Sequence, residues 1–194
     1  MNTLFIDFDG TICHDRFWRS LPLAQYVLIQ NCLFDTDQTI TRDWMCGKYT
    51  SEEICAVVSK KCNLEYDYLW EVFVHDCKTM QITRALLSSI LALRTNFYIV
   101  LITGNMDCFT RFTVPTLRLE YYFNKIVNSA DEGQMKTDDN GATFLTYVQG
   151  DITQAFLIED SEKSCCVFKK LGGKALQVTK ATSTLSHLQS LIFQ

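Results

Sequence analysis

The 194-residue sequence lacks the segments that mark membrane, secreted and nucleic-acid-binding proteins. Its longest apolar stretch in the middle of the chain, residues 97–102, is far too short to span a bilayer. No basic and apolar leader with a cleavage site stands at the N-terminus, which argues against secretion. There is no run of lysine or arginine, and the net charge is −4. We therefore expect a cytoplasmic protein with no membrane and no nucleic-acid partner.

Closely spaced cysteine pairs are also missing, although cysteine itself is abundant. The nine cysteines stand at positions 13, 32, 46, 55, 62, 77, 108, 165 and 166. A structural zinc site needs close pairs, and a disulfide framework is typical of small secreted chains. We expect reduced cysteines that act as small apolar residues, with Cys13, just past an acidic turn, as the candidate for a reactive thiol.

Only two prolines and eight glycines interrupt the chain, so hydrophobic periodicity must place the elements. Residues 16–80 have a helical pattern rich in aromatic residues. Thr50 and Glu53 form a capping box ahead of one helix, a second is expected over 65–77, and a third lies between 17 and 34. We interpret this stretch as a helical insert.

From residue 82 onward, apolar runs alternate with amphipathic segments, which is typical of parallel βαβ units. Strands are expected at 97–102, 125–128, 155–158 and 175–178. Helices are expected at 82–94, 107–121, 140–149, 162–171 and from 183 onward, the second of them bent by Pro115. With a buried strand at 4–6, this alternation predicts an α/β fold built on a parallel sheet.

That first strand leads directly into Asp7-Phe8-Asp9-Gly10-Thr11. Two carboxylates two residues apart on an extended chain point the same way, so their charges repel each other. A divalent cation or a proton-transfer task would justify such a pair. Gly10 allows a tight exit from the strand. A surface turn with the same residues is the alternative, but the preceding buried strand favours a site.

Three later strands also end in polar groups, and parallel strands bring their carboxyl ends to one edge of a sheet. Thr103-Gly104-Asn105 follows the second strand, and Glu159-Asp160-Ser161 follows the fourth. Lys136 follows the third, after a polar loop over 129–135. Carboxylates, a hydroxyl, backbone N–H groups and an ammonium together suit a Mg²⁺-dependent phosphoryl group. Singly, Thr103 and residues 159–161 could instead cap the next helices, and Lys136 could be solvated.

With these segments in this order, the chain resembles the haloacid dehalogenase-like (HAD) hydrolase superfamily over nearly its whole length. Its four motifs are matched by residues 7–11, 102–105, 123–136 and 157–161, the last in the Glu-Asp-Ser variant seen in β-phosphoglucomutase-like members. The resemblance implies a Rossmann-like, three-layer core formed by residues 1–14 and 81–194. It also implies a helical cap of the C1 type over residues 15–80.

The same resemblance implies how the site works. Asp7 would attack phosphorus and become phosphorylated, and Asp9 would act first as general acid and then as general base. Mg²⁺ would bind the Asp7 carboxylate, the Asp9 carbonyl and Asp160, with Glu159 bound directly or through water. Phosphate oxygens would be held by Thr103, Gly104, Asn105 and Lys136.

Some positions depart from the family pattern. Thr137 follows the lysine where relatives usually have proline, Ser164 replaces a frequent Asp or Asn, and His14 replaces a frequent acidic residue. Lys125 is a rival to Lys136, but it lies at the start of its strand and therefore at the wrong edge. Arg16 and Trp18, near the start of the insert, are weaker candidates for substrate contact.

We therefore expect a Mg²⁺-dependent phosphomonoester hydrolase acting on a small soluble phosphorylated metabolite. The resemblance also implies that Asp9 distinguishes this chain from the dehalogenase branch of the family, which lacks an acidic residue at that position. Two alternatives remain: phosphoryl transfer between sugar hydroxyls, as in phosphomutases, and a catalytically idle binding or regulatory module. The sequence gives no indication of the substrate or of the oligomeric state.

Overall fold

A sheet of five parallel strands forms the centre of the structure, a computed structural model that describes residues 1–35 and 38–192. The strands are β1 (Asn2–Ile6), β2 (Phe97–Thr103), β3 (Lys125–Asn128), β4 (Phe156–Glu159) and β5 (Lys174–Gln177). Their order is β3-β2-β1-β4-β5, with parallel pairing throughout. β1 therefore lies in the middle, where both faces are covered, which explains its uninterrupted apolar run. The predicted α/β fold is confirmed.

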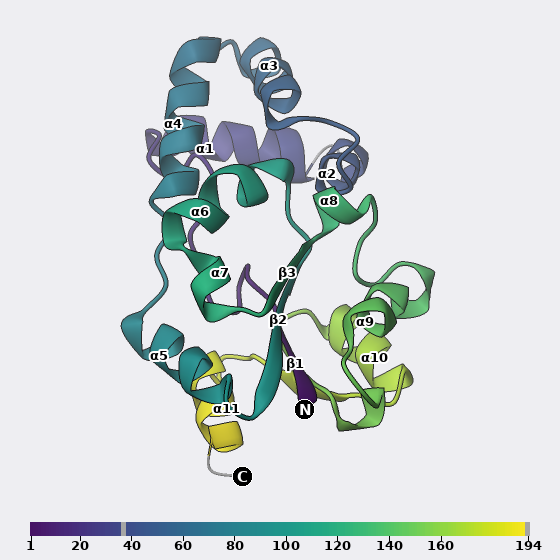
Figure 1. The fold of residues 1–194 in the computed structure, drawn as a ribbon. Coiled ribbons are helices and arrows are strands. Elements are labelled where there is room, and N and C mark those ends of the chain that lie inside the picture. The colour runs from purple at the N-terminus through teal and green to yellow at the C-terminus, as the bar shows by residue number, and fades with distance from the viewer. Residues whose placement is uncertain (36–37, 193–194) are drawn as a thin grey trace.

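Helices cover both faces of this sheet, giving three layers (Figure 1). On one side lie α5 (Arg84–Leu93) and α11 (Thr184–Ile192), and on the other α9 (Ala142–Tyr147) and α10 (Glu162–Lys170). Because side chains alternate along a strand, Leu4 and Ile6 join one apolar cluster while Phe5 joins the other. The Phe5 ring packs edge-on against Phe144 and Phe168, with centroids 5.4 and 5.7 Å away.

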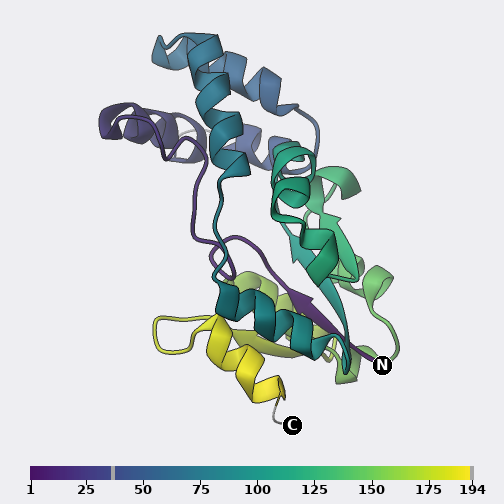
Figure 2. The ribbon, with the colours of Figure 1, turned by 60° about the vertical axis from the view of Figure 1, so that its left-hand side comes forward.

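A group of helices between β1 and α5 lies beyond the carboxyl ends of the strands (Figures 1 and 2). We call α1 (Leu23–Gln30), α2 (Gln38–Met45), α3 (Ser51–Cys62) and α4 (Tyr66–Lys78) the helical insert; a π-helical turn, η1 (Asn31–Asp35), continues α1. The predicted capping box is present, since Thr50 Oγ1 accepts from the Glu53 N–H and the Glu53 carboxylate accepts from the Thr50 N–H. Buried Trp18 and the buried Trp44 of α2 both pack against the buried Phe73 of α4.

The segment predicted as one bent helix over 107–121 is broken into three short pieces: η2 (Phe109–Thr113), α6 (Val114–Leu117) and α7 (Leu119–Tyr122). Pro115 has no N–H to continue a helical ladder, and Arg118 adopts a left-handed conformation with φ 52°. Three further short helical turns lie after β3: α8 (Ser129–Glu132), inside the predicted polar loop, η3 (Asp139–Gly141) and η4 (Ile152–Gln154).

All nine cysteines lie in the described ranges and are free, as the sequence predicted. Cys13 is buried, and burial raises the pKa of its thiol to about 11. Because the thiolate is the reactive form, this environment does not favour the predicted reactive thiol at Cys13. Within residues 1–35 and 38–192, no helix has both the length and the apolar character needed to cross a membrane.

Candidate active site

The carboxylate of Asp7 is buried at the carboxyl end of β1, where it pairs with the ammonium of Lys136. Lys136 Nζ lies 2.5 Å from Asp7 Oδ1 and 2.6 Å from Glu159 Oε2, and it also donates to the Ile102 carbonyl at 3.3 Å. Asp7, Lys136 and Glu159 are only 4%, 6% and 1% exposed. Isolated charges at this depth would be costly, so the three groups are tolerated as a cluster.

The protonation of this cluster follows from burial and from mutual attraction. Burial raises the pKa of Asp7 and raises that of Glu159 to about 7, although the Lys136 charge opposes both shifts. Burial acts to lower the pKa of Lys136, but the two carboxylates outweigh it and raise the pKa above its ordinary value. Lys136 therefore stays charged at neutral pH and holds both carboxylates in place.

A tight turn after β3 delivers Lys136 to this position. The Asp138 carboxylate accepts from the Met135 N–H at 3.0 Å, and the Asp138 N–H donates to the Met135 carbonyl. These two bonds close the turn around Lys136 without the prolines that the family pattern has. Lys125 lies at the opposite edge as predicted, exposed at the start of β3, with its ammonium 5.4 Å from the centre of the Tyr147 ring.

The second carboxylate, Asp9, is partly exposed and is oriented by Asn105. Asn105 Nδ2 donates to Asp9 Oδ2 at 2.7 Å, and an Arg16 guanidinium nitrogen lies 3.6 Å from Asp9 Oδ1. Partial removal from water, and then the charge of Asp7, raise the pKa of Asp9 to about 7. The sequence predicted that Asn105 binds substrate; here its side chain holds Asp9 and accepts from the Met106 N–H. The adjacency of β1 and β2 is the signal that could have revealed this pairing.

Thr103 ends β2, and its buried hydroxyl has no hydrogen-bond partner among the described residues. The following helical turn, η2, has no side-chain cap, so Thr103 does not act as one. The next residue, Gly104, faces two methionines: a Cβ there would lie 2.6 Å from Met135 Cε and 3.2 Å from Met45 Cε. An unpaired buried hydroxyl is the kind of donor that a phosphate oxygen satisfies.

A possible metal site is formed by Asp7, Glu159 and Asp160, whose nearest carboxylate oxygens all lie within 4.8 Å of one another. Asp160 is packed against Gly10, where a Cβ would lie 2.2 Å from Asp160 Oδ2. Its carboxylate has no hydrogen-bond partner in the described part of the chain. Glu159, in contrast, accepts from the Ser161 N–H at 3.1 Å as well as pairing with Lys136. Oxygen ligands of this kind suit Mg²⁺, and Asp160 is the most available of the three.

Solved structures of HAD enzymes have this architecture. A HAD family enzyme from Bacteroides thetaiotaomicron, in its magnesium complex, has 23% sequence identity and a TM-score of 0.75, covering 97% of this chain and 98% of that one. A 2-haloacid dehalogenase from Pseudomonas syringae has 16% identity and a TM-score of 0.66, with 100% and 99% covered. The chain has the HAD hydrolase fold. Neither protein-family models nor curated protein sequences gave a match.

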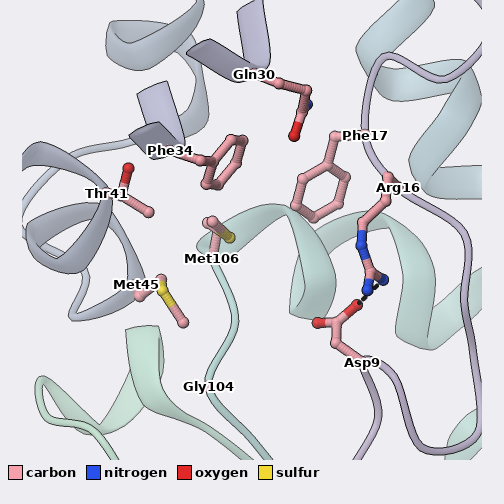
Figure 3. Close-up of a pocket in the computed structure, with 9 residues that line it drawn as sticks. All are labelled: Asp9, Arg16, Phe17, Gln30, Phe34, Thr41, Met45, Gly104 and Met106. Atoms are coloured by element: carbon pink, nitrogen blue, oxygen red, sulfur yellow. Dashed lines mark ion pairs between the residues drawn. The ribbon is translucent and has the colours of Figure 1, made fainter. Parts of the chain in front are cut away.

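In this HAD fold, a cavity of about 280 Å³ separates the helical insert from the strand ends (Figure 3). It is lined by Asp9, Arg16, Phe17, Gln30, Phe34, Thr41, Met45, Gly104 and Met106. Arg16 therefore reaches the site region, whereas Trp18 is fully buried and donates to the Leu69 carbonyl. Apart from Arg16, the lining residues of the insert could not be identified from the sequence, because it does not show which face of each helix meets the strand ends.

Polar contacts at Asp107 hold the insert over the strand ends of the HAD fold. Asp107 Oδ1 accepts from Ser51 Oγ at 2.5 Å and from Trp44 Nε1 at 3.1 Å, both of which belong to the insert. Arg111 bonds Asp107 Oδ2 at 2.7 Å and Glu52 Oε1 at 2.6 Å. Since Asp107 lies four residues after Thr103, these contacts join the insert to the same segment that carries the candidate phosphate-binding residues.

Proposed function

We propose that the protein is a Mg²⁺-dependent phosphomonoester hydrolase acting on a small soluble phosphorylated metabolite, with Asp7 as its nucleophile. The main support is the arrangement at the end of β1, where Asp7 is held by a buried ammonium and Asp9 stands two residues away. The HAD family enzyme from Bacteroides thetaiotaomicron, which shares the fold, has been crystallised with magnesium and inorganic phosphate. The helical insert, predicted to span residues 15–80, would act as a cap over the site.

In this proposal two displacements replace one difficult hydrolysis. An Asp7 oxygen forms a bond to phosphorus while the ester P–O bond breaks, and Asp9 gives a proton to the departing oxygen. Asp9 then takes a proton from water as the water oxygen bonds to phosphorus and Asp7 is released. Thr103 Oγ1 and the Gly104 N–H would donate to the phosphoryl oxygens, and Lys136 would offset their charge.

The residues that would hold Mg²⁺ are Asp7, Asp160 and the carbonyl of Asp9. The carboxylate of Asp160 fits this task, because it is unpartnered among the described residues and is seated against Gly10. Glu159 would orient Lys136, whose ammonium lies 2.6 Å from its Oε2, and would hold the metal directly or through water. When bound, the metal supplies positive charge that allows two anions to approach each other.

The presence of Asp9 favours a phosphate ester as substrate over a halogenated acid. A 2-haloacid dehalogenase is among the proteins that share this fold. A halide leaves as a stable anion and needs no proton. The alkoxide of a phosphate ester is a far poorer leaving group and needs a proton donor close by. Asp9 is oriented by Asn105 and faces the cavity, where it could donate that proton to the leaving alkoxide.

Turnover of 4-nitrophenyl phosphate tests the proposal. Purified protein should release phosphate only with Mg²⁺, and Asp7→Asn should reduce kcat by roughly a thousandfold or more while the variant remains folded by circular dichroism. Chloride release from 2-chloropropionate should stay at background. The proposal is wrong if the wild type releases no phosphate, if Asp7→Asn retains activity, or if phosphate appears only when a sugar phosphate acceptor is added. Absence of Mg²⁺ binding by calorimetry would favour the idle module instead.

A further inference from the structure

The cavity beneath the helical insert is the place where the leaving group of the substrate would bind. Asp9 and Gly104 belong to the candidate active site and also line the cavity. In the proposed reaction Asp9 protonates the departing oxygen, so the group attached to that oxygen must lie on the Asp9 side of the phosphate. The chemistry of the other cavity walls therefore reports on the substrate.

These walls are largely apolar and include two aromatic rings. Figure 3 shows the rings of Phe17 and Phe34 turned toward the cavity, with the thioethers of Met45 and Met106 beside them. Aromatic edges and sulfur atoms make favourable contacts with a flat ring. The hydroxyl groups of a sugar or polyol would lose their water there without gaining equivalent partners.

Most polar side chains in the cavity are already engaged. The Thr41 hydroxyl donates to the Leu33 carbonyl at 2.5 Å, and Arg16 pairs with Asp9 and donates to the Asp15 carbonyl. The Gln30 amide is different, because its side chain has no hydrogen-bond partner among the described residues and extends into the cavity (Figure 3). An amide both donates and accepts, so it can recognise one polar edge of a ring.

We infer that the substrate is a phosphomonoester whose leaving group carries a planar, mostly apolar ring with a hydrogen-bonding edge. The ring lies against Phe17 and Phe34, and its polar edge meets the amide of Gln30. This inference rests on the proposed function and deepens it, because it excludes simple sugar and polyol phosphates as preferred substrates.

Two pairs of substrates with matched reactivity test the inference. Benzyl phosphate and glycerol 1-phosphate are both primary alkyl esters, so a difference in kcat/KM reports on binding of the ring. We expect a preference for benzyl phosphate of about tenfold or more. Pyridin-3-ylmethyl phosphate adds a ring nitrogen, which accepts a hydrogen bond, and should be preferred over benzyl phosphate by about fivefold.

Variants then assign each preference to its residue. Phe34→Ala should reduce the ratio of benzyl to glycerol phosphate by about tenfold, mainly through KM, and Gln30→Leu should remove the preference for the pyridine ring. The matched control is Tyr49→Ala, which truncates an exposed aromatic side chain between α2 and α3 and should leave both ratios unchanged. Melting temperatures show whether each variant is folded.

The outcomes separate this inference from the proposed function. If turnover depends on Asp7 but glycerol 1-phosphate is used as well as benzyl phosphate, the ring site is wrong and the hydrolase stands. The ring site is equally wrong if Phe34→Ala keeps the wild-type ratio while folded. If even 4-nitrophenyl phosphate shows no Asp7-dependent turnover, the hydrolase and the ring site both fail.

Discussion

The ammonium of Lys136 lies 2.5 Å from the carboxylate of Asp7, although the two residues are 129 positions apart in the sequence. Both are buried, and Glu159 shares the same ammonium. Removing this cation would leave two buried carboxylates facing each other without a counter-charge.

Lys136→Met, which keeps the length of the side chain, should therefore reduce both activity and stability. We expect kcat/KM to fall by roughly 10²–10³-fold and the free energy of unfolding at neutral pH to fall by about 3–5 kcal/mol. Assays with 4-nitrophenyl phosphate and urea unfolding measure the two effects. Lys125→Met is the control, since this lysine is exposed at the other end of β3. An active Lys136→Met protein, within about threefold of the wild type, would contradict the role given to this lysine.

Thr103→Val separates a functional hydroxyl from a structural one. The Thr103 hydroxyl is buried and unpartnered among the described residues, so replacing it by a methyl group of similar size should leave stability unchanged or raise it by about 1 kcal/mol. If the hydroxyl binds phosphate, kcat/KM should nevertheless fall by about tenfold or more. Loss of stability with unchanged kcat/KM would show instead that Thr103 serves the fold.

Gly10→Ala should weaken Mg²⁺ binding, because a Cβ at Gly10 would lie 2.2 Å from Asp160 Oδ2. The substitution also strains the backbone, since Gly10 has φ +77°. Gly133→Ala is a matched control: Gly133 has φ +72°, but a Cβ there meets nothing within 4 Å.

Both variants should lose stability, Gly133→Ala by about 1–2 kcal/mol from backbone strain and Gly10→Ala by at least as much, because Asp160 must also move. Only Gly10→Ala should raise the Mg²⁺ concentration that gives half-maximal activity, by about tenfold or more, and isothermal titration calorimetry with Mg²⁺ should agree. Equal Mg²⁺ requirements in the two variants would argue against Asp160 as a ligand.

The contacts at Asp107 predict how stability depends on pH. Burial acts to raise the pKa of Asp107, but hydrogen bonds from Ser51, Arg111 and Trp44 outweigh it and lower the pKa below its ordinary value of 3.8. A group with a lowered pKa in the folded state stabilises the fold above the pKa of the unfolded state. That contribution is lost as the pH falls through the folded pKa.

Asp107→Asn cannot titrate and should lower the free energy of unfolding by about 1–3 kcal/mol near neutral pH. The difference from the wild type should be constant above about pH 5 and should shrink below about pH 4. Urea unfolding across this pH range measures it, and Asp67→Asn is a control, because Asp67 is exposed in the first turn of α4. A difference that grows toward low pH would contradict the assignment.

Much of the fold could be predicted because the signals are local. The strand at 125–128 and the capping box at Thr50 depend on residues adjacent in the sequence, and both are confirmed. The convergence of the strand ends followed from parallel pairing, a general rule that needs no tertiary detail. The break at Arg118 was missed, because a left-handed non-glycine residue leaves little trace in the sequence.

The site was predictable in its outline but not in its contacts. Asn105 was placed near the phosphate, yet its bond to Asp9 depends on the relative positions of two strand ends. Gln30 and Phe34 were not identified, because their exposure to the cavity depends on how the helical insert sits over the sheet. Hydrophobic periodicity and motif spacing do not predict such packing between segments that are distant in the sequence.

The most direct test of the central claim is to identify the residue that carries the phosphoryl group during turnover. Enzyme mixed with 4-nitrophenyl phosphate and Mg²⁺ would be quenched, reduced with borohydride, digested and analysed by mass spectrometry. An acyl phosphate on Asp7 would be reduced to homoserine, so we predict that change at position 7 in enzyme mixed with substrate and not in enzyme without it. Efficient turnover with position 7 unmodified, or with the change at another carboxylate, would contradict the account.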